Sequence, residues 1–467
     1  MRASGILMHL SSLPSPYGIG TMGKAAFEFV DFLEESGQKY WQLLPIGPTG
    51  YGDSPYQSYC TFAGNPYFID LDILEKEGLL DRQDYVDTDW ETNPAQVDYG
   101  LLYEKRYPLL KKATKRFLES PSKEFESFCE KNAFWLDDYA RFMSMRGEHG
   151  GMPDIEWKVL QYFFFMQWKN LKDYANRKGI LIIGDLPIYV SLDSVEVWAY
   201  PELFQLDENK MPTEVAGCPP DGFSKDGQLW GNPLYDWDYM EAEGFTWWIQ
   251  RIQYLCEIYD VLRIDHFRGF ESYYAIPYGD ATAQNGHWKK GPGMKLFHAV
   301  EEAIGKRSII AEDLGHVTDE VRKLLKDSGF PGMKVLQFAF DRRDENSAEY
   351  LPHHFIEHCV AYTGTHDNDT ILGWFEEANE EDVAYAKEYL KISEGTDLNW
   401  GMMDALWDSV AELTIVQAQD LLGLGNEARM NKPATVGRNW QWRALPGAFT
   451  KELAEKVKKR MEKWGRS

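Results

Sequence analysis

The chain has 467 residues, of which 44% are hydrophobic and 26% charged, and its formal net charge is −25. This composition is typical of a folded protein with a sizeable core, and the length allows two or three domains or one large barrel with insertions. A strongly negative surface repels phosphate backbones and anionic lipids, which argues against nucleic acid and membranes as partners but does not penalise neutral ligands.

Five cysteines are scattered along the chain, and no Cys-x-x-Cys pair occurs. An odd, scattered set predicts reduced thiols rather than a disulfide framework or a zinc site, so we expect a cytoplasmic protein. The N-terminal stretch MRASGILMHL has neither the length of a membrane span nor the features of a signal or transit peptide.

Short apolar runs recur along the chain and predict buried strands. In chain order they are residues 5–10, 40–46, 180–185, 260–265, 308–313, 334–341, 359–367 and 413–418. Helix-like stretches separate most of them, for example 24–37, 292–305 and 318–329, the last with Thr318 as N-cap and Gly329 as its end. Eight strands alternating with helices predict one α/β domain over 1–467, a parallel (β/α)8 or TIM barrel, with a doubly wound open sheet as the alternative.

Two connections are too long for simple crossovers and predict inserted subdomains after the second and third strands. The first, about 47–179, is mostly helical in pattern, and the second covers about 186–259. Within the second, residues 216–237 are rich in Gly, Pro and Trp, which is typical of a loop. A loop of this length is usually functional or disordered, and its tryptophans favour an ordered, functional one.

Two phosphate-binding motifs occur in outline near the N-terminus but fail in context. Gly18-x-Gly20-x-x-Gly23 resembles a dinucleotide fingerprint, but the preceding strand ends too early and the next strand carries no acid for a ribose. A near match to the P-loop has Ala25 where Ser or Thr must bind Mg²⁺. We therefore prefer a glycine-rich loop under a barrel mouth.

Acidic residues stand where predicted strands end. In a parallel barrel these ends converge on one mouth that carries the chemistry, although any single acid there can instead cap the following helix. Like charges crowded together repel one another, so convergence of several acids favours a working site over a structural one. The five acids are Asp185, Asp265, Glu312, Asp341 and Asp367.

Two of these acids suit complementary roles. Arg263 and Asp265 lie two residues apart on one strand, so both face the same side, and the guanidinium favours an ionised, nucleophilic carboxylate. Glu312 has no basic neighbour in sequence and is a candidate for a raised pKa and general-acid work. One ionised and one protonated carboxylate make a glycosidase site. The pattern alone does not choose between Glu312 and Asp313, or between Asp367 and Asp369.

A metal site is the competing interpretation of the strand-end residues. Metallohydrolase sites need several convergent His ligands. The first strand supplies only His9, while His354 and His358 precede the seventh strand and are expected at the opposite end of the barrel. We therefore predict no metal site.

Several long motifs, spread over essentially the whole chain, resemble those of one known family. They are similar to motifs of the 4-α-glucanotransferases, also called amylomaltases or disproportionating enzymes, which belong with the α-amylase-like retaining barrels. The motifs are GPTGYGDSPYQS (47–58), FAGNPYFIDLD (62–72), IGDLPIYV (183–190), LRIDHFRGF (262–270), IIAEDLG (309–315), YTGTHDNDT (362–370) and EARMNKP (427–433).

The resemblance implies roles for individual residues. It implies that Asp265 is the nucleophile, Glu312 the general acid/base and Asp367 the carboxylate that stabilises the transition state. It implies that residues 216–230 form a lid and that Tyr51 belongs to a second glucan-binding patch. It further implies substrate contacts from Ser54, Tyr56, Asp185, Gln228, Trp230, Arg263, Asp341, His366 and Asn431.

The implied reaction is transfer of α-1,4-glucan segments between maltooligosaccharides or starch-type glucans, with glucose and other sugars as acceptors and with no cofactor. The resemblance also implies a compact form without the N-terminal starch-binding extension or transit peptide of some members. An α-glucan hydrolase on the same barrel is the nearest alternative, since only the acceptor differs. A non-catalytic glucan-binding protein is the second, and the presence of all three carboxylates argues against it.

Overall fold

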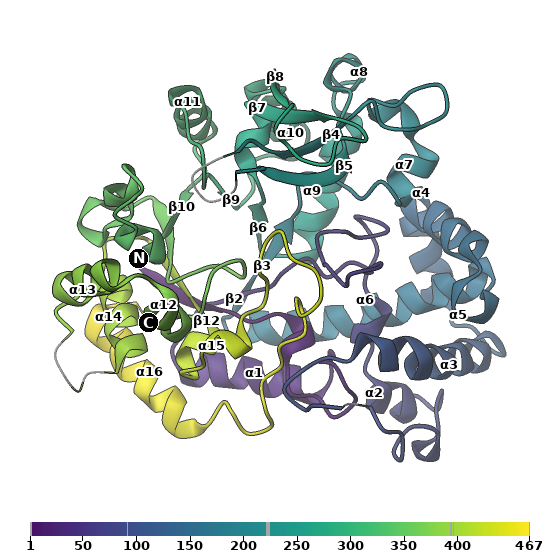
Figure 1. Cartoon of the computed structure of the whole chain (residues 1–467). Coiled ribbons are helices and arrows are strands. Elements are labelled where there is room, and N and C mark those ends of the chain that lie inside the picture. Colours follow the sequence, from purple (N-terminus) through teal and green to yellow (C-terminus); the bar gives the residue numbers. More distant parts are fainter. Residues whose placement is uncertain (1, 91, 221–224, 393–394, 396, 467) are drawn as a thin grey trace.

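The computed structural model describes the chain apart from residues 1, 91, 221–224, 393–394, 396 and 467. Within the described residues, parallel strands close a barrel in the order β1-β12-β11-β10-β9-β6-β3-β2 (Figure 1). The barrel prediction is confirmed, and the open sheet is excluded. The strands are β1 (Ala3–Leu7), β2 (Tyr40–Gln42), β3 (Leu181–Leu186), β6 (Val261–Ile264), β9 (Ile309–Ala311), β10 (Gly332–Val335), β11 (Cys359–Tyr362) and β12 (Leu413–Gln417).

Each of these strands lies in or overlaps a predicted apolar run, but several runs extend beyond the strand. The clearest case is the run 334–341, because β10 ends at Val335 and residues Leu336–Phe340 form a 3-10 helix. An apolar run without periodicity fits a buried strand and a buried helical turn equally well. The prediction of a strand up to residue 341 is therefore wrong.

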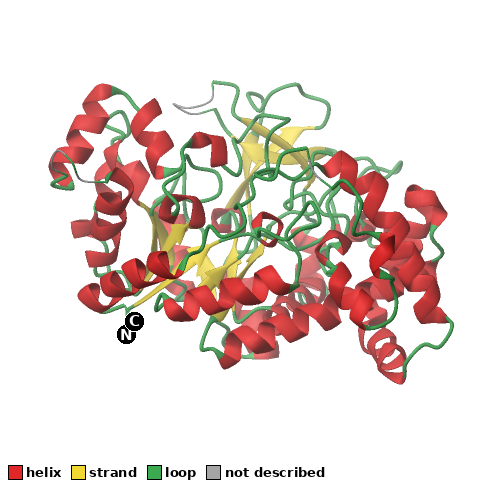
Figure 2. Cartoon of the chain, turned by 90° about the horizontal axis from the view of Figure 1, so that it is seen from below, coloured by secondary structure: helices red, strands yellow, loops and turns green. Residues whose placement is uncertain are grey.

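Helices flank the barrel strands as expected (Figure 2). The predicted helices correspond to α1 (Lys24–Glu35), α10 (Met294–Ile304) and α11 (Asp319–Ser328). The hydroxyl of Thr318 accepts the N–H of Val321, and Gly329 ends α11 in the left-handed conformation, so both predicted end signals operate. Apart from two helices that accompany the small sheet described below, the other helices after β3 are α9 (Thr246–Ile258), α12 (Ile371–Glu377), α13 (Glu380–Tyr389), α14 (Leu398–Asp408), α15 (Ala418–Leu421) and α16 (Lys451–Trp464).

A helical region occupies the chain between β2 and β3 and extends from one side of the barrel (Figure 1). Three of its helices begin at side-chain caps: Asp70, Asp98 and Ser122 each accept a backbone N–H of the first turn. The helices are α2 (Leu71–Lys76), α3 (Tyr99–Leu118), α4 (Lys123–Arg146), α5 (Glu148–Gly151) and α6 (Asp154–Arg177).

A small antiparallel sheet with strand order β5-β4-β7-β8 stands beside the barrel (Figure 1). Two strands, β4 (Glu214–Cys218) and β5 (Gln228–Pro233), come from the chain between β3 and β6, which also contains α7 (Val195–Ala199) and α8 (Trp237–Ala242). The other two, β7 (Ser272–Pro277) and β8 (His287–Lys290), lie after β6, where the sequence analysis placed no strand.

This sheet corrects the predicted loop over 216–237. Both ends of the proposed lid, 216–230, are strands of the β4–β5 hairpin, and residues 221–224 of it lie outside the described residues. Glycine and proline at such density usually interrupt strands. Here Gly217 is required in the strand, because a side chain at that position would collide with the carbonyl of Gln228 across the hairpin.

The barrel interior is filled by apolar side chains, among them Leu7, Ile183, Ile310, Val360 and Ile415. Below this plug the chain ends meet: the guanidinium of Arg466 donates to the carbonyl of Ala3 at 3.1 Å, and the termini lie close together in both views (Figures 1 and 2). A filled barrel restricts ligand access to its ends. In the described part of the chain, no helix is both long and apolar enough to span a membrane.

Candidate active site

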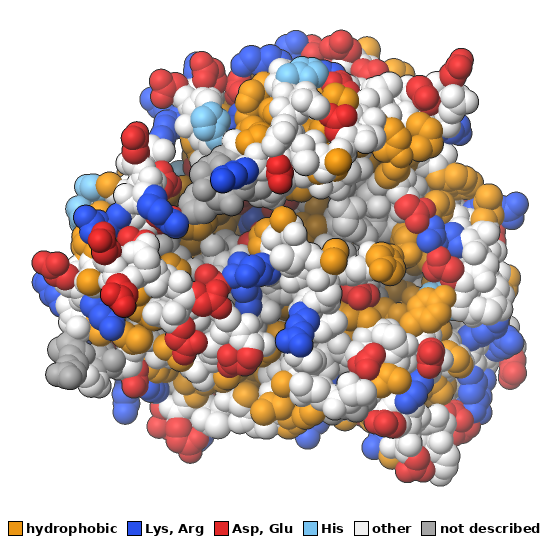
Figure 3. All heavy atoms as spheres, viewed as in Figure 1, with side chains coloured by type: hydrophobic (Ala, Val, Ile, Leu, Met, Phe, Trp, Pro, Cys, Tyr) orange, Lys and Arg blue, Asp and Glu red, His pale blue; other side chains and the backbone are white. Residues whose placement is uncertain are grey.

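A cleft of about 510 Å³ lies at the carboxyl ends of the barrel strands. Figure 3 shows this face of the molecule hollowed near its centre, with hydrophobic side chains visible in the hollow. The cleft brings together most of the residues predicted for the site. Those that line it are Ser54, Tyr56, Gln228, Trp230, Arg263, Asp265, Glu312, His366, Asp367 and Asn431.

Asp265 follows β6 directly and is held at the end of the strand by a hydrogen bond from its N–H to the carbonyl of Leu186, at 3.0 Å. The Nη2 atom of Arg263 lies 3.2 Å from Oδ1 of Asp265, so the predicted contact is present. The Nη1 atom of the same guanidinium donates to both carboxylate oxygens of Asp185, at 2.8 and 2.7 Å. Asp185 and Arg263 are register partners on neighbouring strands. The charge of Arg263 is thus shared by two carboxylates.

The protonation of Asp265 is subject to opposing influences. Burial raises its pKa well above the ordinary carboxyl value, and the charge of Arg263 acts in the opposite direction. The neighbouring carboxylates Asp185 and Glu312 raise the pKa of Asp265 further. Burial, which the sequence pattern does not reveal, therefore has a larger effect on the pKa of Asp265 than the charge of Arg263.

Glu312 lies just after β9 with both carboxylate oxygens engaged. Oε2 accepts the backbone N–H of His266 at 2.7 Å, and Oε1 accepts that of Leu314 at 2.8 Å. Burial raises the pKa of Glu312, while Arg263 and the two N–H groups lower it. A raised pKa is what the sequence predicted for a general acid, and these two hydrogen bonds fix the carboxyl in the cleft.

The structure separates the two ambiguous pairs of carboxylates. Asp313 accepts the N–H of Met333 at 2.7 Å and does not line the cleft, whereas Glu312 does. Asp369 is bound by the guanidinium of Arg429 and by the amide of Asn426 at 2.9 Å, and it also lies outside the lining. Glu312 and Asp367 are therefore the members of each pair that a ligand in the cleft can reach.

Within the described residues, the contacts of the Asp367 side chain reach one carboxylate oxygen, Oδ1. The amide of Asn431 donates to its Oδ1 at 2.6 Å, and Nε2 of His366 lies 3.3 Å from the same oxygen. The side chain of Asp367 is 44% exposed, so its remaining lone pairs face the cleft. This arrangement suits a carboxylate that accepts hydrogen bonds from sugar hydroxyls.

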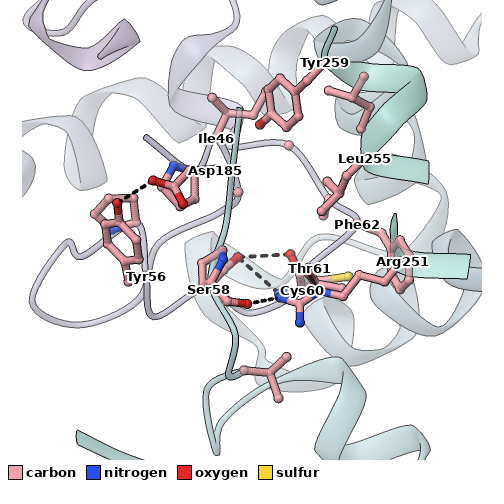
Figure 4. Close-up of a pocket in the computed structure, with 18 of the residues that line it drawn as sticks. Ile46, Tyr56, Ser58, Cys60, Thr61, Phe62, Asp185, Arg251, Leu255 and Tyr259 are labelled. Carbon is pink, nitrogen blue, oxygen red and sulfur yellow. Dashed lines mark hydrogen bonds between the residues drawn. The ribbon is translucent and has the colours of Figure 1, made fainter. Parts of the chain in front are cut away.

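Tyr56 links the cleft to the buried pair of Arg263 and Asp185. Its hydroxyl donates to Asp185 at 2.8 Å, as Figure 4 shows, and its ring stacks on His366 with centroids 5.0 Å apart. Asp185 does not line the cleft itself but lines a small second cavity of about 40 Å³, which adjoins the cleft because Tyr56 lines both. Asp185 therefore acts on the cleft through Tyr56 and Arg263.

Trp230 and Gln228 lie on β5, the edge strand of the small sheet, and form one wall of the cleft. The indole N–H of Trp230 donates to the amide oxygen of Gln228 at 3.1 Å. A partly buried indole beside an amide presents an apolar face and polar edges, which suits a sugar ring. Ser54 also lines the cleft.

Besides Asp185, two predicted residues lie outside the cleft lining. Asp341 follows a 3-10 helix instead of a strand, and its carboxylate is taken by the guanidinium of Arg343 at 2.8 Å. The prediction that Asp341 converges with the other strand-end acids is therefore not met in this structure. Tyr51 is fully exposed, away from the cleft lining, as expected for a separate surface patch.

Sequence reasoning missed several residues that line the cleft, including His266, Phe338 and Trp440. His266 adjoins Asp265 within the quoted LRIDHFRGF motif, so its position was a usable signal. Phe338 belongs to the run assigned to a strand, and Trp440 lies in a C-terminal segment without a charged motif. Their contribution depends on how the loops fold over the barrel mouth.

Within the described residues, no group of three or more His, Cys, Asp or Glu side chains has the geometry to hold a metal ion. His354 bonds the carbonyl of Ala348, and His358 pairs with Glu412. None of the five cysteines is assigned to a disulfide in the structure as described.

Comparison with known proteins gives consistent matches over the whole chain. The family model of the 4-alpha-glucanotransferases matches residues 8–159 and 154–447. A 4-alpha-glucanotransferase of Clostridium butyricum is 50% identical over 98% of this chain and all of its own length, and one of Thermus thermophilus is 47% identical over 98% of this chain and 97% of its own length.

Solved structures agree with these sequence matches. An amylomaltase from Streptococcus agalactiae, determined in complex with acarbose, superimposes with a TM-score of 0.96 at 43% identity, and the match covers all of both chains. The chain belongs to the 4-α-glucanotransferase family.

Proposed function

We propose that this enzyme moves α-1,4-linked glucan segments between maltooligosaccharides by a retaining double displacement in the cleft. The observation that carries the mechanism is the presence of Asp265, Glu312 and Asp367 in one cleft, beside the buried pair of Arg263 and Asp185. Relatives named for this transfer, at up to 50% identity along the chain, support the same activity.

Asp265 attacks the anomeric carbon of the donor while Glu312 gives a proton to the departing O4. The bond from the anomeric carbon to O4 breaks, the shorter glucan leaves, and an ester of Asp265 remains. Glu312 then removes a proton from the 4-hydroxyl of an incoming sugar, which attacks the anomeric carbon and releases Asp265. Two inversions give net retention, and the chemistry needs no cofactor.

The division of labour between Asp265 and Glu312 follows from their contacts. Asp265 and Glu312 are coupled carboxyls in one buried site. When the pair loses its first proton, the negative charge stays on the carboxyl whose surroundings stabilise it better. The guanidinium of Arg263, which Asp265 shares with Asp185, lies 3.2 Å from Asp265, whereas Glu312 receives hydrogen bonds from two neutral N–H groups. Charge therefore settles on Asp265, and the remaining proton on Glu312.

Sugar recognition follows from the remaining polar groups. Asp367 and His366 face the ring hydroxyls of the unit that is transferred, and Tyr56 offers its ring as a stacking surface beside them. Gln228 and Trp230 on β5 provide the wall for the acceptor. We place the enzyme in the cytoplasm, in keeping with cysteines that are not assigned to disulfides among the described residues.

Incubation with maltotriose tests the proposal. Transfer releases glucose and builds longer maltodextrins while the total of reducing ends stays nearly constant. A rise of reducing ends in step with glucose would identify a hydrolase, and no reaction would identify a binding protein. The Glu312→Gln variant serves as the blank, since it lacks the proton donor.

A further inference from the structure

His266 directly follows Asp265, the proposed nucleophile, and has an unusual backbone conformation. Its φ and ψ are 50° and 48°, in the left-handed region. Few residues other than glycine adopt this conformation, and those that do gather at functional sites. The turn is fixed on its far side, where Gly269 donates to the carbonyl of His266 and Phe267 donates to that of Glu312, both at 2.9 Å.

The turn presents the N–H of His266 to the proposed acid/base. That N–H donates to Oε2 of Glu312 at 2.7 Å, instead of continuing the ladder of the barrel. The only other hydrogen bond recorded for this carboxyl among the described residues comes from Leu314. The backbone of His266 thus fixes one of the two oxygens that must give and take the proton.

The side chain of His266 points to the other half of the site. Its ring meets Trp230 edge to face, with centroids 4.8 Å apart and an interplanar angle of 89°. Both rings line the cleft, but Trp230 belongs to the small sheet and His266 to the barrel. Burial and the charge of Arg268 lower the pKa of His266 to about 3, so the ring packs as a neutral group. Its Nε2 is buried and makes no hydrogen bond within the described residues.

We propose that His266 is a positioning residue that joins the two halves of the reaction: its backbone orients Glu312, and its ring holds Trp230 in place for the acceptor. The inference rests on the proposed function of the cleft. Because the backbone of His266 acts on Glu312 and its ring acts on Trp230, different substitutions can test the two roles separately.

Removal of the ring alone is tested by His266→Gly, which keeps the N–H and adopts positive φ freely. With maltotriose as donor and glucose as acceptor, we expect KM for glucose and the hydrolytic share of product to rise at least about threefold. The pH profile of kcat/KM should keep its position, because Glu312 retains its hydrogen bond. His266→Asn, which tolerates the left-handed region, should behave in the same way if the glycine variant folds poorly.

Displacement of the N–H is tested by His266→Val, because a β-branched residue strongly disfavours this conformation. The lost hydrogen bond stabilised the charged form of Glu312, so the pKa of Glu312 rises and the alkaline limb of kcat/KM moves to higher pH. His266→Ala is the milder variant should the valine variant not fold. The ionisable groups that act on Glu312 in both cases are Arg263, Asp265, Asp313, Tyr350 and Tyr362.

His149 provides the matched control. It is also a histidine in the left-handed region, with φ of 53°, and its ring stacks on Tyr107 with centroids 3.3 Å apart, but it does not line the cleft. The variants His149→Gly and His149→Val should leave the hydrolytic share and the pH profile of the unmodified enzyme unchanged. If folded His266 variants match their His149 counterparts, His266 is no positioning residue. Failure of the unmodified enzyme to transfer glucan would instead overturn the proposed function.

Discussion

Individual carboxylates in the cleft differ mainly in what surrounds them. Asp265 lies 3.2 Å from a guanidinium, Glu312 accepts two backbone N–H groups, and Asp367 is partly exposed beside an amide. Asp313 is adjacent to Glu312 in sequence, yet it accepts the N–H of Met333 outside the cleft. Position within a few ångströms, rather than residue type, therefore decides which acid a ligand in the cleft can reach.

Substitution of the two central carboxylates by amides tests these roles. An amide is a poor nucleophile and cannot deliver a carboxyl proton, so Asp265→Asn and Glu312→Gln should each lower kcat by at least about 100-fold. Transfer rates on maltotriose and melting temperatures measure activity and folding separately. Asp313→Asn is the matched control and should keep most of the activity. Near-normal turnover of either cleft variant would contradict the mechanism.

At the level of elements, the β4–β5 hairpin contributes an aromatic wall of the cleft, because Trp230 lies on β5 and not on a strand of the barrel. Trp230 on β5 faces the cleft across from the barrel residues, next to Gln228. A transferase must keep water from the glycosyl ester long enough for a sugar to attack it, and an occupied acceptor wall excludes water and positions the 4-hydroxyl.

Removal of the Trp230 side chain should therefore weaken acceptor binding more than the chemical step. We expect Trp230→Ala to raise the hydrolytic share of maltotriose turnover severalfold, measured as the increase in reducing ends per glucose released. Trp198→Ala, which removes a partly exposed tryptophan on α7 outside the cleft lining, should leave this ratio unchanged. An unchanged ratio in Trp230→Ala would show that Trp230 neither binds the acceptor nor excludes water.

Asp420, on α15, connects this helix by hydrogen bonds to the residue after β11 and to the start of α12. Its carboxylate accepts the hydroxyl of Thr363 at 2.8 Å and the N–H of Ile371 at 2.7 Å, and burial raises its pKa to about 7. Between the ordinary carboxyl pKa and 7 the folded state binds more protons than the unfolded state, so stability falls as pH rises. A shift of this size corresponds to roughly 4 kcal/mol as an upper bound.

The variant Asp420→Asn removes this ionisation and retains an oxygen that can accept the N–H of Ile371. The melting temperature of the unmodified protein should fall from pH 5 to pH 8 more steeply than that of Asp420→Asn. Parallel curves for the two proteins would show that Asp420 is not protonated in the folded state at pH 5.

For the molecule as a whole, the sequence predicted the barrel well because buried parallel strands leave a strong signal, a continuous apolar run that ends in charge. It predicted β7 and β8 poorly, since SYYAIP and HWKK belong to an antiparallel sheet beside the barrel, where packing decides pairing. The pairing of Asp185 with Arg263 depends on strand register, which no local pattern encodes. Asp341 was misplaced because a 3-10 helix replaced the end of its strand.

The net charge of −25 is also a property of the whole molecule. Long-range fields accelerate the binding of charged ligands and weaken as salt screens them, but they do not act on neutral ligands. For neutral glucans, KM should therefore change less than about twofold between 0.05 and 0.5 M sodium chloride. A steep salt dependence of KM would show that a charged group of the substrate or a salt-sensitive opening of the cleft controls binding.

The covalent ester on Asp265 is the central claim, and mass spectrometry of a trapped intermediate tests it most directly. The Glu312→Gln variant is incubated with α-maltotriosyl fluoride, whose fluoride leaves without a proton donor, while the lack of a base slows the attack that would release the ester. The account predicts a protein heavier by one maltotriosyl group, with the added mass on the peptide that contains Asp265. The same mass on a peptide that lacks Asp265, or turnover without any adduct, would contradict it.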